Sequence, residues 1–216
     1  MLRLSLGSAS SLVDYVQRQL DNLFPDGAAD QRPALDTHIH TALKRLQHTI
    51  NTVRWWPGDE FDHLHSSQYA IFLYTLAHTL WCAGVPRPLC NKLFGLNKAL
   101  NGIDLFYEIE MPEVFFIGHS VGIVLAKATY GERLVLYQGC TVGKNHGHAP
   151  VLGEGVVMYP GSAIIGRCQI GAGSVIAPGV SVVNQSTPGA CLVFAGQAGK
   201  LLFKPPTQDA LSDLFR

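Results

Sequence analysis

The sequence lacks the features that mark several broad classes of protein. Among 216 residues, sixteen basic side chains balance sixteen acidic ones, and neither sign forms a block. That balance argues against the basic surfaces typical of proteins that bind nucleic acid or anionic membranes. The most apolar stretch, "YAIFLYTLAHTLW", is interrupted by His78 and Thr79. It is shorter than the roughly 18 residues that a membrane span needs. The N-terminal segment has no sustained apolar core, so we expect a helix start there and not a signal peptide.

Cysteine is also sparse. The five cysteines are odd in number, scattered, and never form a CxxC pair, which predicts a reduced, cytoplasmic compartment. The histidine pairs in "DTHIH" and "DHLHSS" are two residues apart. Residues at that spacing face different sides of a helix, so no metal site is predicted from them.

Residues 1–100 have the spacing of helices and predict an all-α domain. Four apolar residues of the first segment recur every four positions: Leu12, Val16, Leu20 and Phe24. They share one helix face, and Ser10 or Ser11 is the expected N-cap. Further helices are predicted within residues 36–56, 66–82 and 89–100. The segment at 66–82 is apolar on all sides, as a buried helix would be.

After residue 101 the pattern changes to a period of six. One run of aliphatic residues is unbroken: Leu152, Met158, Ile164, Ile170, Ile176 and Val182. A compact residue stands four positions after each of the first five: Val156, Ser162, Cys168, Ser174 and Val180. The same period continues backwards through Val142, Leu136, Tyr130 and Val124. The single step of ten, from Val142 to Leu152, marks a short excursion within "GKNHGHAP".

A period of six fits neither a helix nor an alternating strand. It is typical of a triangular solenoid, in which each face takes one short strand and one tight turn. The aliphatic residue then points into the prism, and glycine supplies turn conformations closed to other residues. We therefore predict an α+β chain with helices at 1–100, a parallel β-helix at 101–200 and a tail at 201–216.

The segments "GHSVGIVLAKA", "YQGCTVG" and "KNHGHAPVL" resemble the hexapeptide-repeat acyltransferases, and most of all the serine O-acetyltransferases. Their signature reads "DHATGIVVGET", "QSVTLGG" and "RHPKI". The resemblance implies a left-handed β-helix after a helical domain. It also implies that the catalytic histidine is His119, paired with an aspartate fifteen residues upstream, where this chain has Asp104.

The chemistry suits that pair. An acceptor hydroxyl must lose its proton as it attacks the thioester of acetyl-CoA, and a neutral imidazole is suited to take that proton at cellular pH. A carboxylate on the other ring nitrogen fixes the tautomer and stabilises the imidazolium. A buried histidine bonded to a backbone carbonyl is the alternative interpretation of His119.

Two differences from the family signature concern residues that would bind the acceptor. The family has an aspartate directly before the histidine, near the amino-acid substrate, and here that substrate-binding position is Gly118. The family loop "RHPKI" supplies an arginine and a second histidine, whereas "NHGHAP" has no arginine. His148 is the favoured second catalytic histidine because a proline follows it closely, and His146 remains an alternative that would contact the substrate. The acceptor is then serine, a related molecule or a sugar.

For the donor, the resemblance implies a CoA groove along the outside of the β-helix, with Gly161 and Ala177 beside the pantetheine arm. A family motif "AGVPAR" corresponds to "AGQAGK", where Ala195, Gly196 and Lys200 match. The lysine would meet the nucleotide phosphates as a point charge. The resemblance also implies a homotrimer, or a dimer of trimers through the helices, and no metal.

Two alternatives belong to other classes. One is a non-catalytic solenoid subunit, which would have no need to keep both Asp104 and His119. The other is a carbonic anhydrase of the hexapeptide type, with His119, His146 and His148 as zinc ligands. The helical domain and Asp104 argue against the second.

Overall fold

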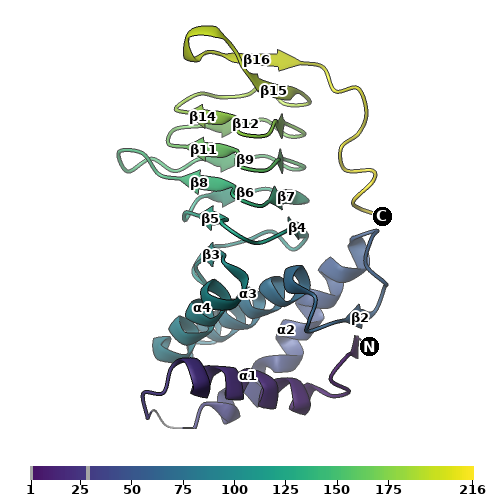
Figure 1. Cartoon of the computed structure of the whole chain (residues 1–216), viewed down its shortest axis with the longest axis vertical. Coiled ribbons are helices and arrows are strands. Elements are labelled where there is room, and N and C mark those ends of the chain that lie inside the picture. The colour runs from purple at the N-terminus through teal and green to yellow at the C-terminus, as the bar shows by residue number, and fades with distance from the viewer. Residues whose placement is uncertain (1, 28–29) are drawn as a thin grey trace.

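A computed structural model describes residues 2–27 and 30–216, and it has two parts (Figure 1). Four helices form the N-terminal part. A column of stacked, short parallel strands follows and forms a solenoid. The α+β class and the order of the two parts are as predicted from the change of period.

The helical part is built around one fully buried helix. The helices are α1 (Ala9–Leu23), α2 (Arg32–Thr52), α3 (Ser66–Cys82) and α4 (Arg87–Asn101). A small parallel pair, β1 (Arg3–Leu4) with β2 (Glu60–Phe61), lies beside them. Helix α3 packs against both α2 and α4. All its residues from Ser67 to Leu80 are buried, because the segment is apolar on every side.

The first helix begins two to three residues earlier than the sequence indicated. The hydroxyl of Ser8 accepts a hydrogen bond from the backbone N–H of Ser11 at 3.0 Å. Ser8 is therefore the N-cap, and the expectation of Ser10 or Ser11 was wrong. Several serines in a row could each serve as the cap, and only the extended backbone of Ser8 distinguishes it.

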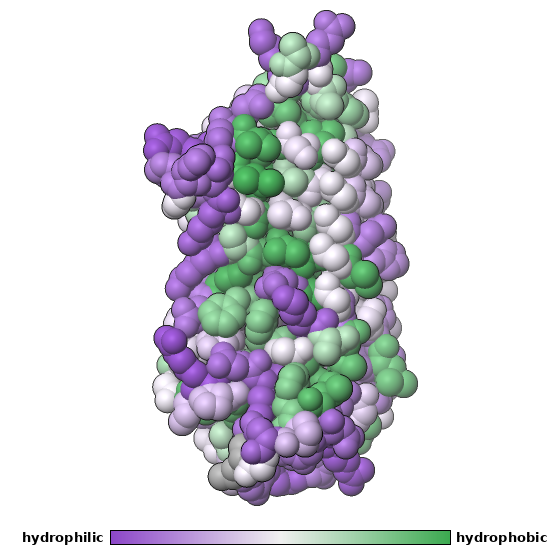
Figure 2. Space-filling model, turned by 60° about the vertical axis from the view of Figure 1, so that its left-hand side comes forward, coloured by the Kyte–Doolittle hydropathy of each residue, from purple (hydrophilic) through white to green (hydrophobic). Residues whose placement is uncertain are grey.

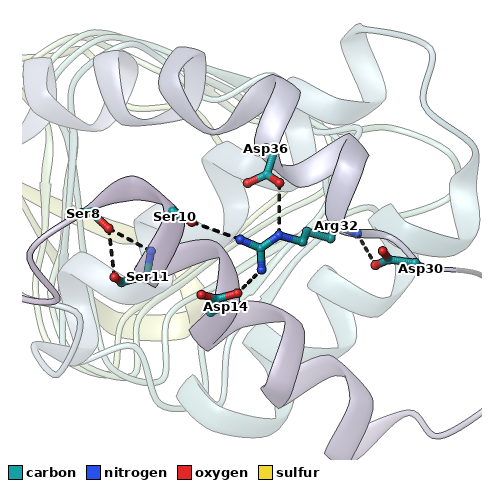
Figure 3. A network of polar contacts seen from close by, with 7 residues as sticks. All are labelled: Ser8, Ser10, Ser11, Asp14, Asp30, Arg32 and Asp36. Carbon is teal, nitrogen blue, oxygen red and sulfur yellow. Dashed lines mark hydrogen bonds and ion pairs between the residues drawn. The ribbon is translucent and has the colours of Figure 1, made fainter.

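Arg32, at the start of α2, ties α2 to α1 (Figure 3). Its guanidinium pairs with Asp14 of α1 and, at 3.2 Å, with Asp36 one turn along its own helix. It also donates to the hydroxyl of Ser10 at 3.0 Å. One arginine thus links the first two helices.

The solenoid has three faces. The first face is a six-stranded sheet in the order β16-β15-β13-β10-β7-β4, the second has the order β14-β11-β8-β5-β3, and the third has β12-β9-β6. All neighbours are parallel except β15 and β16, which form an antiparallel hairpin at the end. The strands of the first face are β4 (Phe115–Gly118), β7 (Leu134–Tyr137), β10 (Val157–Met158), β13 (Val175–Ile176), β15 (Leu192–Ala195) and β16 (Leu201–Lys204).

The other two faces have shorter strands. The second face holds β3 (Asp104–Leu105), β5 (Val124–Leu125), β8 (Thr141–Gly143), β11 (Ala163–Ile165) and β14 (Ser181–Val183). The third holds β6 (Thr129–Tyr130), β9 (Val151–Leu152) and β12 (Gln169–Ile170). Strand β16 continues the first sheet four residues into the segment predicted as tail.

The period of six predicts the core of the prism correctly, with one exception. The residues from Tyr130 to Val182 in the hexad series are all buried. Val124 is the exception and is 45 % exposed. The register pairs Leu125, not Val124, with the inward Val142, so the phase shifts by one residue in the first coil. The expectation that Val124 points inward was wrong for this reason.

The C-terminal residues return along the solenoid to the helical part (Figure 1). Phe215 forms an antiparallel bridge with Val53, at the end of α2, and both are buried. The backbone N–H of Arg54 donates to the carbonyl of Leu214 at 2.7 Å, and Arg216 donates to the carbonyl of Thr52 at 2.9 Å. We call residues 205–216 the strap, since they join the last coil to the helices.

We expect the strap to contribute measurably to stability. Phe215 is 5 % exposed, so Phe215→Ala should lower the free energy of unfolding by about 3 kcal/mol. A thermal melt would then shift down by roughly 6–12 °C for a chain of this size. Phe203→Ala, which removes the same ring from a position that is 40 % exposed, is the matched control. Equal melting temperatures for the two variants would show that the strap is not anchored as described.

Candidate active site

His119 stands at a corner of the solenoid, directly after β4. Its side chain is exposed and makes no hydrogen bond or ion pair with any residue within 2–27 or 30–216. The interpretation of His119 as a buried histidine bonded to a carbonyl is therefore wrong. The next residue fixes the corner instead, because the hydroxyl of Ser120 is buried and donates to the carbonyl of Asn101 at 2.6 Å. The imidazole is thus held in place by its backbone and is free at both nitrogens.

His119 has a left-handed backbone conformation, with φ of 63°. Such a value is uncommon for a residue other than glycine. Arg133 and Ala190 adopt the same conformation at other corners, so this conformation is a property of the solenoid turn. Its consequence is local, since it turns the imidazole out of the prism.

Asp104 lies in β3, on the coil that precedes the His119 corner. Its backbone pairs with Val124, five residues after His119. Its carboxylate forms an ion pair with Lys98 of α4 at 2.6 Å. No hydrogen bond joins it to His119 among the described residues. The spacing of fifteen therefore places the two residues on neighbouring coils, while the carboxylate is directed to a lysine of the last turn of α4.

The excursion predicted between Val142 and Leu152 is a small hairpin. Asn145 and His148 exchange two backbone hydrogen bonds of 3.0 Å, and His146 at its tip has φ of 47°. The hairpin follows β8, whereas His119 precedes β5 on the same face. The hairpin and His119 hence lie at opposite edges of this face, and one chain does not bring His146 or His148 to His119.

Arg167 is a residue that the sequence did not suggest. It lies on the coil after the hairpin, and its guanidinium contacts the Nε2 atom of His148 at 2.6 Å. Arg167 therefore brings a guanidinium to the hairpin from the next coil. Gln169 pairs with Val151 in the parallel ladder. Arg167, two residues before Gln169, therefore lies beside the hairpin that precedes Val151. A prediction of the strand register from one coil to the next would have found this contact.

Gly118, the position of the missing aspartate, has no room for a side chain. A Cβ atom there would lie 2.8 Å from two ring carbons of Tyr137 and 2.9 Å from a ring carbon of Phe116. Tyr137 is the register partner of Gly118 in the neighbouring strand. Two aromatic rings thus lie against the backbone of Gly118, directly before His119.

The two positions predicted beside the pantetheine arm lie on one edge of the first face. Gly161 is exposed at a corner with φ of 70°. Ala177 is buried, and its N–H and carbonyl are both used, toward Val193 at 3.0 Å and Val180 at 3.2 Å. The backbone of Ala177 is thus already engaged within the solenoid, and its role beside the pantetheine arm stays a prediction.

The segment predicted to meet the nucleotide is the terminal hairpin. Ala195 pairs with Leu201 across the hairpin, and the N–H of Gly196 donates to the carbonyl of Lys200 at 2.8 Å. The Lys200 side chain is exposed and has no partner among the residues that the structure describes. It remains available to an anionic group.

The described residues contain no group of three or more histidine, cysteine or acidic side chains that could hold a metal ion. A zinc site of the carbonic anhydrase type would need His119 together with His146 and His148. Within one chain these histidines lie apart. Within residues 2–27 and 30–216, no helix is both long and apolar enough to cross a bilayer.

Sequence comparison points to one group of enzymes. No family model matches the chain. A serine acetyltransferase of Mycobacterium tuberculosis is 29 % identical over 133 residues, which are 58 % of this chain and 56 % of that protein. Serine acetyltransferase 2 of Arabidopsis thaliana is 32 % identical over 152 residues, 68 % of this chain and 46 % of that protein. The chain spans about half the length of the curated relatives that it matches.

Comparison of structures extends the likeness to the whole fold. Serine acetyltransferase of Brucella abortus superposes with a TM-score of 0.70 and 23 % identity, over 93 % of this chain and 85 % of that one. The chain has the fold of the serine acetyltransferases. The enzyme of Neisseria gonorrhoeae agrees, with a TM-score of 0.72, 18 % identity and coverage of 94 % and 81 %. The predicted left-handed β-helix of the serine acetyltransferase type, behind a helical domain, is confirmed.

Proposed function

We propose that the protein transfers an acetyl group from acetyl-CoA to a hydroxyl of a small acceptor. The observation that supports this most strongly is the free imidazole of His119, exposed at a corner of a serine acetyltransferase fold. A related enzyme of Brucella abortus has been solved in complex with coenzyme A. Relatives named for serine acetylation support an oxygen nucleophile.

In this reaction His119 acts as general base. It takes the proton of the acceptor hydroxyl while the oxygen attacks the thioester carbonyl. The carbon–oxygen bond forms, the carbon–sulfur bond breaks, and the imidazolium returns the proton to the departing thiolate. Gly161, Ala177, Ala195, Gly196 and Lys200 would line the path of CoA, with Lys200 at its phosphates.

Asp104 is proposed as the carboxylate that orients His119, which requires it to exchange Lys98 for the imidazole. The ion pair with Lys98 is partly exposed, with side-chain exposures of 57 % and 31 %. Such pairs contribute only about 0–1 kcal/mol to stability, so breaking this pair costs little free energy. Binding of acetyl-CoA or of a neighbouring subunit at the His119 corner would favour the contact of Asp104 with His119 over that with Lys98.

Asp104→Asn tests this role. We expect kcat to fall by a factor of about ten or more, because the amide cannot stabilise an imidazolium. Lys98→Met is the matched control, since it removes the competing cation and keeps the carboxylate. It should leave kcat equal to or above the native value. If both variants lose activity equally, the ion pair itself is what the corner needs, and Asp104 is not the orienting group.

We further propose that the active site is completed by a second copy in a homotrimer. Within one chain His119 and the hairpin with His148 lie at opposite edges of a face, so a neighbouring prism would be needed to join them. Large apolar side chains such as Val121, Val124 and Val183 are exposed, and Figure 2 shows apolar side chains continuing up one face of the prism. A dimer of trimers through the helices, and a cytoplasmic location, complete the proposal.

The proposal is tested by following release of the CoA thiol from acetyl-CoA with L-serine and a set of other hydroxyl acceptors. Release that depends on one of the acceptors supports the transferase. Absence of both CoA binding and acceptor-dependent release would instead favour the non-catalytic solenoid.

A further inference from the structure

A cavity of about 400 Å³ lies in the helical part, where the helices meet the first strand of the solenoid's first face. Helix α2 forms one wall and α3 another, and residues 112–115, which lead into β4, form the third. Its volume falls in the range of small-molecule sites, which is roughly 300–1,000 Å³. None of the residues that line it belongs to the proposed active site or to the proposed path of CoA.

The bottom of this cavity consists of buried residues. Thr49, Tyr74, Thr75 and Phe115 line it, and each is at most 4 % exposed. The rings of Tyr74 and Phe115 meet edge to face, with centroids 6.0 Å apart and planes at 82°. A further aromatic ring packs favourably on such a pair in an offset or edge-to-face arrangement. The bottom of the cavity therefore suits a flat apolar group.

The hydroxyl groups at the bottom are already used inside the protein. Those of Thr49 and Thr75 each donate to a backbone carbonyl at 2.8 Å. The hydroxyl of Tyr74 donates to a backbone carbonyl at 2.6 Å and accepts from a backbone N–H at 3.1 Å. Burial raises the pKa of Tyr74, so its phenol stays neutral. The bottom thus offers a ligand neither a free donor nor a charge.

The free donors stand at the rim and are cationic. Lys44 and Arg45 line the cavity from one face of α2, with His48 one turn further along. Lys44 is exposed and has no hydrogen bond or ion pair with any residue within 2–27 or 30–216. Arg45 is half-buried, and its Nη1 atom donates to the hydroxyl of Thr79 at 3.1 Å. A guanidinium has five N–H donors, and no carboxylate pairs with this one in the part of the chain that the structure describes.

One carboxylate also lies at the rim. The side chain of Glu113 is 85 % exposed, and its Oε2 atom is 3.8 Å from Nε2 of His48. Glu113 therefore faces His48 and leaves Lys44 and Arg45 without a partner. With His48 neutral, the lining carries two cations and one anion, a net charge of +1. That charge favours a ligand with a single negative charge.

We propose that this cavity binds a small carboxylate that carries a flat apolar group, such as an arene carboxylate. The carboxylate accepts hydrogen bonds from the guanidinium of Arg45, a geometry that suits this pair of groups, and forms an ion pair with Lys44. The apolar group lies against Tyr74 and Phe115. The site is independent of the proposed transferase function. Because its ligand would bridge α2 and the segment before β4, binding should stabilise the junction of the two parts.

Binding is measured on the full-length protein by ligand-detected NMR titration, with the melting temperature as a second readout. The probes are benzoate and phenylacetate, and benzamide is the matched neutral compound. At least one carboxylate should bind and raise the melting temperature. Benzamide should bind at least tenfold more weakly, since it has no charge for the rim cations. Equal binding of benzamide and benzoate would overturn the inference.

Two substitutions then locate the site. Arg45→Met and Lys44→Glu should each weaken binding of the carboxylate about tenfold or more, the size expected for a charge-assisted hydrogen bond or ion pair. Arg18→Met removes an exposed arginine of α1 that lies outside the cavity, and it should change nothing. Lys44→Glu alters an exposed side chain, so its melting temperature without ligand should be near native. It keeps the test valid if Arg45→Met is destabilised.

Three further results would contradict the inference. The first is failure of both carboxylates to bind. The second is binding that survives both Arg45→Met and Lys44→Glu, which would place the anion elsewhere on the protein. The third is phenyl phosphate binding more than tenfold tighter than benzoate and lost in the same variants. That result would assign the cavity to phosphate esters instead of carboxylates.

Discussion

His119→Asn is expected to lower kcat by a factor of about 10²–10⁴, the range that general-base catalysis contributes. Asparagine keeps a side chain with polar atoms at this corner, and it tolerates the left-handed backbone that His119 adopts. It cannot accept a proton at neutral pH. The loss should therefore appear in kcat, with little change in the KM for acetyl-CoA or in the melting temperature.

The matched control is His146→Asn, which makes the same change at a residue that also has positive φ. Its effect on kcat should be much smaller, since it lies at the tip of the hairpin and not at the corner. His148→Asn separates the two hairpin histidines, and a larger loss from it than from His146→Asn would support its proposed catalytic role. Native turnover by His119→Asn would show that another group removes the proton.

Gly131→Ala is expected to cause a large loss of stability. A Cβ atom at this position would lie 2.4 Å from the carbonyl carbon of Gly153 and 2.5 Å from the nitrogen of Glu154. Both are backbone atoms of the next coil, so two coils would have to separate. Overpacking usually costs about 1–3 kcal/mol, and we expect the upper end, with the melting temperature lowered by roughly 6–12 °C.

Gly143→Ala is the control for that substitution. Its added methyl would first meet a side-chain carbon of Ile165, at 3.4 Å, which is close to ordinary contact. The change in stability should be well under that of Gly131→Ala. Equal stabilities of the two variants would mean that the coils are not in contact at the Gly131 corner.

The solenoid could be predicted from the sequence because its contacts repeat. Each inward residue meets its equivalent one coil away, so a fixed spacing of six encodes the core directly. The prediction was wrong at Val124, in the first coil, where Leu125 takes the inward position instead. The helices were likewise evident from their own spacing, while the N-cap Ser8 depended on backbone conformation among several serines.

The candidate site was predicted only in part. His119 and Asp104 were proposed from spacing and resemblance, but the ion pair of Asp104 with Lys98 depends on how the chain turns from α4 into β3. Arg167 reaches His148 across coils. The strap returns from the last coil to α2, and it closes one side of a cavity lined by Tyr137, Tyr159 and Phe194. The Arg167 and strap contacts have no local pattern, because each joins segments that are distant along the chain. Lys98 and Asp104 are only six residues apart, and their contact depends on the turn between α4 and β3.

The most direct test of the account is transfer of label from radiolabelled acetyl-CoA to an acceptor, with the native protein and His119→Asn side by side. The account predicts that label appears in an ester of a hydroxyl acceptor with the native protein and is nearly absent with the variant. Equal transfer by both proteins, or release of the label only as free acetate, would contradict it.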